Sequence, residues 1–391
     1  MSVKKLLALS IAFAALPAFA QAQQGESWLL VTDMWGNAAY STLTLARDGS
    51  TLSGELDGDP LTGKVSGNTL HFVATDAQGT QYRFTGKRDR ATMEGDADYA
   101  DSNNPSARAH HRFTARRLPD QPAGPPRRHA FHPTDYSNSF DADRAPVLVL
   151  WPGDSVQTTT IDSGGVDEQG ATRALFGNPQ TGPFFIMGAR PGDTLAIHIK
   201  RLTPNRDYAD SLDTVVGRAL GSSFAAQAAD LGKPVRWKLD LAAGRASPEG
   251  ATGALAAFSV PLRPMLGGLA VAPGFGSARL STGDTARTGG NMDFNEVVAG
   301  NTVYLPVQQP GALLYLGDAH AAQGDGETPS TPWRPRWRSN SAWTSSRAGR
   351  SDRPGSNRLA RSWCSARLDH STRRPGRPAP GCFNGSSRTT A

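Results

Sequence analysis

Two aspartates, a histidine and a glutamate crowd the segment GDAHAAQGDGE, which follows the apolar run ALLYL. Asp318 and His320 are two residues apart, and a second acidic pair, Asp325 and Glu327, repeats that spacing beyond Gly324. Residues i and i+2 of an extended strand share a face, so each pair can direct two side chains to one point. A reversal at Gly324 would gather all four as oxygen and nitrogen ligands suited to Zn²⁺ or a harder divalent ion. A solvated loop is the alternative interpretation of this spacing.

A second polar segment, TGGNMDFNE at residues 288–296, carries Asn291 and Asp293 directly after two glycines. Glycine has no Cβ, so Gly290 and its neighbour would let the backbone approach a ligand closely. The alternative is a glycine turn that leads into the strand NTVYLPV.

Two histidines, His129 and His132, stand at the start of a long β-rich region, beside Asp135. Imidazole and carboxylate groups are common in binding sites, so His132 is a candidate for contact with a substrate. A solvated position at the entry to the domain is the alternative for both histidines.

The residues before these candidates predict a small β-domain over residues 25–117. Short apolar runs there are interrupted by glycine every eight to twelve residues, and alternation such as TLTL followed by Asp48-Gly49 is typical of antiparallel hairpins. We expect an antiparallel barrel or meander. The proline-rich residues 118–128 predict a linker of limited flexibility.

Residues 129–327 predict a second, mainly β domain. APVLVLWPGDSVQTTTI and FFIMGARPGDTLAIHIKRL each place Pro-Gly-Asp between two strands, where proline and glycine suit the two central positions of a turn. Only residues 214–232 are alanine-rich enough for a helix, and the glycines within them weaken that expectation. The pattern therefore favours a β-sandwich with few helices.

The first residues predict export of the chain. Residues 1–22 combine two early lysines, an apolar run to Ala20 and small residues suited to cleavage, as a secretory signal peptide does. We expect a periplasmic or secreted protein without a membrane span, since the apolar run is short for a bilayer. Both cysteines lie beyond residue 327, so the body offers no cysteine nucleophile.

Residues 328–391 differ in composition from everything before them. They hold 13 Arg and no Lys, Val or Ile, and without them the chain carries a net charge of −5, which gives a nucleic-acid partner no support. A solvated basic arm is one interpretation.

A shifted reading frame is the other interpretation of residues 328–391. In the shifted frame, each new codon consists of the third base of one codon and the first two bases of the next. From Ser330 on, with the degenerate bases chosen freely, such codons can be translated as NALETSMEVELGVDVI. Because tryptophan has one codon, Trp343-Thr344 forces an aspartate. We predict a frameshift near Thr328 to Ser330 and a disordered tail.

Several blocks in order carry a resemblance to a known family. GNPQTGPFFIMGARPGDTLAIHI, PNRDYA, VPLRPMLGGLAVAP and GGNMDFNEVVAGNTVYLPVQQPGALLYLGDAHAAQGDGE are similar to the acetamidase/formamidase family, from about His129 to Glu327. The resemblance implies a mainly β fold and hydrolysis of small linear amides of the formamide or acetamide type to a carboxylate and ammonia. It also implies a divalent metal, most readily zinc, with calcium or another ion as the alternative. The small β-domain lies outside it.

The resemblance also assigns roles to the candidate residues. Asp293, Asp318 and His320 are expected to bind the metal, and His320, Asp325 and Glu327 are the catalytic candidates, with Glu327 as the base. Gly290, Asn291 and His132 are expected to contact the amide, and homo-oligomerisation is left open. A secreted β-sandwich that binds a ligand without catalysis, or an inactive truncated family member, is the competing hypothesis.

Overall fold

The computed structural model describes residues 25–101, 103–104, 106–212, 234–324, 337–338 and 345–348. Within these ranges the chain is nearly all β, which confirms the predicted fold class, and the helix present there is a single 3-10 turn, Gly253–Leu255. The helix predicted at residues 214–232 lies outside the described residues, and so do residues 1–22, for which a signal peptide is predicted. In the described part of the chain, no helix has the length and apolarity needed to cross a membrane.

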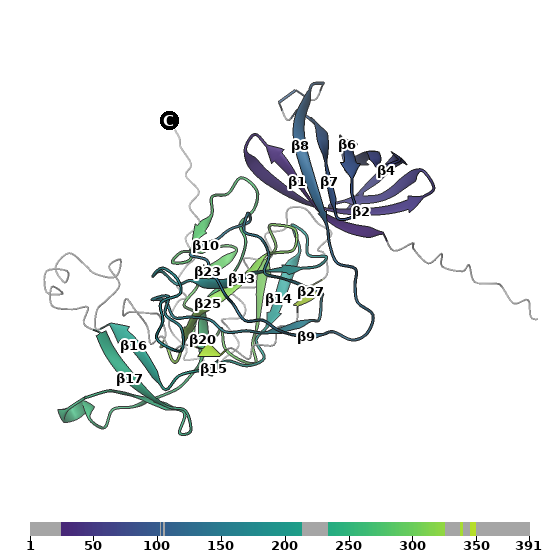
Figure 1. Ribbon diagram of the computed structural model, residues 1–391. Coiled ribbons are helices and arrows are strands. Elements are labelled where there is room, and N and C mark those ends of the chain that lie inside the picture. The colour runs from purple at the N-terminus through teal and green to yellow at the C-terminus, as the bar shows by residue number, and fades with distance from the viewer. Residues whose placement is uncertain are drawn as a thin grey trace, which may run out of the picture. The chain divides into compact units, whose positions relative to one another are not determined.

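The first eight strands form a closed antiparallel barrel (Figure 1). Each strand pairs with the next, and the first pairs with the last to close the sheet. The strands are β1 (Glu26–Met34), β2 (Asn37–Asp48), β3 (Thr51–Leu56), β4 (Asp59–Ser66), β5 (Thr69–Thr75), β6 (Gln81–Arg88), β7 (Thr92–Ala100) and β8 (Arg108–Arg117). The barrel confirms the predicted antiparallel meander, and closure leaves it without an unpaired edge.

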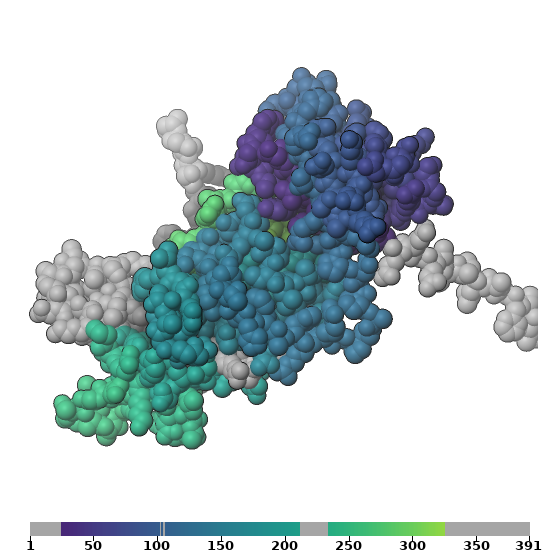
Figure 2. All heavy atoms as spheres, viewed as in Figure 1, coloured from purple at the N-terminus to yellow at the C-terminus, as the bar shows by residue number. Residues whose placement is uncertain are grey.

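Apolar side chains point into the barrel because they alternate with exposed ones along each strand. In β6, for example, Phe84 is buried between the exposed Arg83 and Thr85. Phe84 stacks on Phe72 with the ring centroids 4.7 Å apart, and the same buried cluster includes Trp28 and Phe113. On the face shown in Figure 2, the atoms of the barrel strands pack into a continuous surface. The interior of the barrel is thus a hydrophobic core.

The second β region is built from several small sheets. One contains six strands in the order β11-β13-β25-β20-β23-β22, and another has the order β24-β14-β27. The strands of these two sheets are β11 (Leu148–Leu150), β13 (Gln180–Ile186), β14 (Thr194–His198), β20 (Met265–Val271), β22 (Thr285–Ala286), β23 (Gly289–Asn291), β24 (Thr302–Pro306), β25 (Leu314–His320) and β27 (Ser345–Ala348). The β13–β25, β25–β20 and β20–β23 pairs are antiparallel, and β11–β13 is parallel.

The remaining strands flank these sheets. A four-stranded sheet has the order β16-β17-β18-β19, and three two-stranded sheets pair β10 with β21, β12 with β9, and β15 with β26. These strands are β9 (Arg128–Ala130), β10 (Ser139–Phe140), β12 (Ser155–Gln157), β15 (Thr203–Pro204), β16 (Tyr208–Leu212), β17 (Pro234–Asp240), β18 (Arg245–Pro248), β19 (Val260–Pro261), β21 (Leu280–Ser281) and β26 (Trp337–Arg338).

One hydrophobic core joins the six-stranded sheet to the β24-β14-β27 sheet. Leu195 and Ile197 of β14 lie in the same buried cluster as Leu305 of β24 and Leu314 and Leu316 of β25. Both faces of β25 are buried, since all seven of its residues are inaccessible to solvent. The packing of two sheets over a shared core confirms the predicted β-sandwich.

The aspartate of each Pro-Gly-Asp motif accepts a backbone hydrogen bond within its turn. The backbone N–H of Trp151 donates to Asp154 at 3.1 Å, and that of Arg190 donates to Asp193 at 3.0 Å. Each carboxylate thus accepts a hydrogen bond from the residue three positions earlier, which fixes the turn.

Two short strands lie in the tail for which disorder is predicted. β27 pairs with β14 from Ser345↔Ile197 to Ala348↔Thr194, and β26 pairs with β15. All other residues from 325 onward lie outside the described residues.

Candidate metal centre

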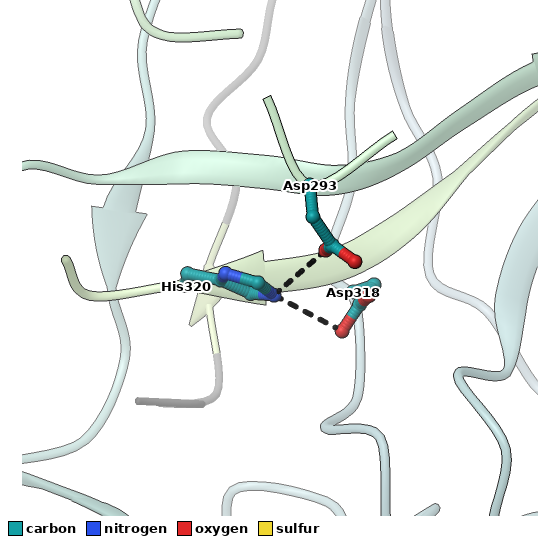
Figure 3. A group of neighbouring side chains, drawn as sticks. All are labelled: Asp293, Asp318 and His320. Atoms are coloured by element: carbon teal, nitrogen blue, oxygen red, sulfur yellow. Dashed lines mark ion pairs between the residues drawn. The ribbon is translucent and has the colours of Figure 1, made fainter. Parts of the chain in front are cut away.

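Three of the predicted ligands converge at the end of β25. The side chains of Asp293, Asp318 and His320 offer ligand atoms that all lie within 4.8 Å of one another. His320 Nε2 is 3.3 Å from Asp318 Oδ1 and 3.7 Å from Asp293 Oδ1 (Figure 3). Asp318 and His320 come from β25, and Asp293 follows β23 from the other side of β20. The i, i+2 spacing therefore directs both β25 side chains to one point.

In two neighbouring strands, β25 and β20, the alternation of core-facing and outward-facing side chains shifts by one residue at this level, and this change of phase places the ligand side chains outside the main core. Leu314, Leu316 and Ala319 all pack into the main core, although strict alternation would place residues 316 and 319 on opposite faces. The same shift occurs in β20, where Leu266 and Leu269 share that core. Both shifts occur at one level of the sheet, between the pairs Leu266↔Ala319 and Gly268↔Gly317. His320, between two core alanines, is thereby directed out of the hydrophobic core.

Left-handed backbone accompanies this change of phase. Asp318 has φ +49° and Asp293 has φ +43°, a region that residues with a Cβ enter at a cost of about 1–3 kcal/mol. The backbone N–H groups of Met292 and Asp293 both donate to the carbonyl of Gly267, at 2.8 and 3.2 Å, and this holds the second of these conformations. Strained backbone at two of three converging side chains is typical of functional sites.

Gly267 forms the floor of the cluster. A Cβ placed on this residue would lie 2.6 Å from Asp293 Oδ1, 2.8 Å from Asp318 Oδ2 and 2.8 Å from His320 Nε2. Real Cβ atoms do not approach other heavy atoms so closely, and here all three neighbours are the ligand atoms themselves. The missing side chain of Gly267 leaves a cradle about the size of an ion among them.

The charges in this cradle fit a cation. Asp318 and His320 are fully buried, and the Asp293 side chain is 16% exposed. Asp293 Oδ1 and His320 Nε2 are buried and make no hydrogen bond in the described part of the chain. Two carboxylates and an imidazole lone pair in a buried site repel one another unless a positive charge lies between them. One imidazole with two carboxylates is a donor set that suits Zn²⁺ and similar divalent ions.

A layer of amide side chains supports the three ligands. Asn291 donates from Nδ2 to Asp293 Oδ2 at 2.7 Å and accepts from Asn178 Nδ2 at 2.8 Å. Gln323 Oε1 lies 2.7 Å from His320 Nδ1, and Gln323 Nε2 donates to the backbone carbonyl of Asp293 at 2.5 Å. The Asn291 amide thus orients Asp293, and the substrate contact predicted for Asn291 stays a prediction. No role was predicted for Asn178 or Gln323.

Gly290 and His132, two of the other predicted site residues, do not join the cluster. Gly290 has φ +136°, and a Cβ there would lie 2.3 Å from the carbonyl of Asp284, so close strand pairing accounts for this glycine. His132 is exposed and is not one of the three converging residues. Asp325 and Glu327 lie outside the described residues, so the predicted gathering of four side chains about Gly324 stays a prediction.

His129 pairs with an aspartate that belongs to a turn, away from the cluster. Its Nε2 lies 2.9 Å from Asp154 Oδ2, and the backbone N–H of Arg127 donates to the other oxygen of Asp154 at 2.7 Å. Burial would raise the pKa of the Asp154 carboxyl, but the hydrogen bonds from Arg127, His129 and Trp151 outweigh burial and lower this pKa below its ordinary value. Asp154 therefore joins the start of β9 to the turn before β12.

The fold and the cluster together describe a β-sandwich with a buried group of two carboxylates and an imidazole. Residues 275–330 match the model of the Acetamidase/Formamidase family, which confirms the resemblance that the motifs indicate. This segment contains Asp293, Asp318, His320 and Gln323.

Individual proteins are similar to parts of this chain. A Schizosaccharomyces pombe protein that carries the name of a formamidase is 54% identical over 39 residues, and the match spans 10% of this chain and 10% of that protein. The solved acetamidase of Bacillus halodurans is 25% identical, with 56% of this chain and 70% of that chain covered and a TM-score of 0.43. The solved bradavidin2–biotin complex is 21% identical and is covered over 96% of its length by 24% of this chain, with a TM-score of 0.21.

Proposed function

We propose that the chain is an exported, metal-dependent amidohydrolase that acts on small linear amides of the formamide or acetamide type. The observation that carries the proposal is the convergence of Asp293, Asp318 and His320 on the cradle above Gly267. Support comes from the family match, which includes all three residues, and from the names of the formamidase and acetamidase relatives. Export rests on the signal-like residues 1–22.

The residues of the site would provide a largely buried binding site for the ion. A divalent cation, when bound, polarises an amide carbonyl and lowers the pKa of water. Asp318 and His320 would hold the ion from the buried side of the cradle. Asp293 is the partly exposed member, so the amide would approach along its side. Asn291 keeps one oxygen of Asp293 engaged by a hydrogen bond, which leaves Oδ1 directed at the cradle.

Proton transfer requires a group beyond these three. We assign it to Glu327, with Asp325 beside it, because both follow the site within the same motif. A carboxylate there would accept a proton from water as it attacks the carbonyl carbon and deliver it to the nitrogen, so that the C–N bond breaks with ammonia as the leaving group.

Release of ammonia tests this proposal. The zinc-loaded chain should release ammonia from formamide or acetamide, should lose this activity after dialysis against a chelator, and should regain it when zinc is restored. Ammonia is measured by a coupled assay and zinc by mass spectrometry. Activity that survives removal of all metal would contradict the metal-dependent mechanism. Tight zinc binding without any ammonia release would favour the competing hypothesis of a non-catalytic binding module.

The altered composition after residue 327 bears directly on this activity. We propose that the gene shifts frame near Thr328 to Ser330, so that residues beyond this point replace the strand sequence NALETSMEVELGVDVI. Support comes from the change in composition, from the fixed tryptophan codon of Trp343, and from the end of the family match at residue 330. Loss of those strands would remove part of the cover over a buried site.

Restoring the frame should therefore raise both stability and activity. A gene with one base inserted or deleted near the codon of Thr328 is expected to yield a chain with a higher melting temperature and faster ammonia release than the chain described here. Sequencing the gene across this point is the first check. If no single-base change produces NALETSMEVELGVDVI, the frameshift proposal is wrong.

A further inference from the structure

Gln323 contacts the cation site through both ends of its side-chain amide. We propose that Gln323 is a positioning residue, which holds His320 in the tautomer that can bind a metal and fixes the loop of Asp293 beside it. This inference deepens the proposed function and rests on the proposed cation site, and its test separates the two.

The contact to the imidazole determines where the ring proton lies. Gln323 Oε1 lies 2.7 Å from His320 Nδ1. An amide oxygen can only accept a hydrogen bond, so Nδ1 must carry the proton. In the neutral ring, the lone pair then belongs to Nε2, the atom that faces Asp293 and Asp318. Metal-binding histidines commonly use their second nitrogen in this way, and the partner fixes both tautomer and ring orientation.

The opposite end of the amide confirms which atom is oxygen. Gln323 Nε2 donates to the backbone carbonyl of Asp293, and a carbonyl can only accept. If the two ends of the Gln323 amide were exchanged, its oxygen would face the carbonyl oxygen of Asp293, and neither atom could donate a hydrogen bond. Its NH₂ group would face His320 Nδ1, which could accept a hydrogen bond only after losing its proton. The two contacts therefore support one another, and one orientation of the amide satisfies both.

Gln323 also connects two segments that are distant in sequence. His320 ends β25, and Asp293 lies in a left-handed conformation 30 residues before Gln323. The backbone carbonyl of Gly267 accepts hydrogen bonds from the N–H groups of this loop, and Gln323 donates one to the backbone carbonyl of Asp293. The distance between the imidazole and the Asp293 carboxylate is thus set before any ion binds, which reduces the ordering required on binding.

Two substitutions separate positioning of the imidazole from simple support of the loop. Gln323→Met removes both contacts at similar length, and Gln323→Glu keeps the acceptor for His320 Nδ1–H but loses the donor to Asp293. Zinc affinity is measured by competition with a chromophoric chelator. The tautomer of His320 in the metal-free protein is read from ¹⁵N shifts of its ring. Gln308→Met is the matched control, because Gln308 Nε2 donates to the backbone carbonyl of Val307 and is not part of the site.

We expect Gln323→Met to lower zinc affinity by about 10- to 100-fold, the range typical for loss of such a partner. The ring of His320 should then shift toward the Nε2–H form. Gln323→Glu should keep the Nδ1–H form and recover most of the affinity, and Gln308→Met should bind zinc as the parent does. Equal losses in the Glu and Met variants, or an unchanged tautomer in Gln323→Met, would overturn the inference. If zinc binds as expected and no ammonia is released, the amidase proposal fails while this inference stands.

Discussion

Replacing His320 with alanine is expected to abolish metal content and amide hydrolysis together. Its Nε2 would be the nitrogen ligand of an ion in the cradle, and the substitution would leave two carboxylates that hold an ion less tightly. Zinc in the purified protein should fall from about one ion per chain to a trace, since zinc sites with protein ligands require at least three of them. Mass spectrometry of the metal and the ammonia assay are the two measurements, carried out on the frame-restored chain as well.

A histidine on another strand provides the control. His198 lies on β14, and its Nδ1 is 3.2 Å from Thr302 Oγ1, apart from the cluster. His198→Ala should retain zinc and activity. Circular dichroism shows whether His320→Ala keeps the β fold. A folded His320→Ala variant with full activity would refute the assignment of this ligand.

Replacing Gly267 with alanine should abolish metal binding although every ligand is still present. The new methyl group would occupy the cradle, within 2.8 Å of an atom from each of the three ligands. The three side chains can move away from the methyl group only if the strands that carry them repack. Such overpacking costs about 1–3 kcal/mol of folding free energy. We expect zinc affinity to fall by at least about 100-fold, the upper end of the loss seen when a supporting partner is removed. Calorimetry measures the affinity, and thermal unfolding measures the stability.

Gly274→Ala serves as the matched control for this substitution. A Cβ on Gly274 would lie 3.5 Å or more from its nearest neighbours, which belong to Gln308, and the backbone of Gly274 has no positive φ. This variant should bind zinc with unchanged affinity. If Gly267→Ala also binds zinc normally, the ion does not occupy the space above Gly267, and the proposed geometry is wrong.

The sequence predicted those parts of the fold that depend on local patterns. Alternation and glycine spacing predicted the antiparallel barrel, and the Pro-Gly-Asp motifs predicted two turns that Asp154 and Asp193 close. Local patterns do not specify which strands pair over long distances. The neighbours of β25 are β13 and β20, each more than 40 residues earlier in the chain.

The site was predictable where spacing alone places the side chains. Asp318 and His320 follow from the period of a strand, but Asp293 came from the resemblance, because nothing local joins it to a residue 25 positions later. Gly267 was missed because its role is the absence of a side chain, visible only once three side chains from two other segments surround it. Gln323 lies within the polar motif itself, but its partners depend on the change of phase at Asp318, for which the sequence carries no simple signal.

The left-handed backbone of Asp293 and Asp318 limits how this site can be lost in evolution. Among residues with a Cβ, asparagine and aspartate tolerate such φ values best. A descendant freed from the need for a metal could exchange either aspartate for asparagine at little cost to its fold, whereas alanine or glutamate would add backbone strain. Asparagine at both positions, with the glycine of the cradle retained, would therefore mark a lineage whose ion site decayed while its β-sandwich remained under selection.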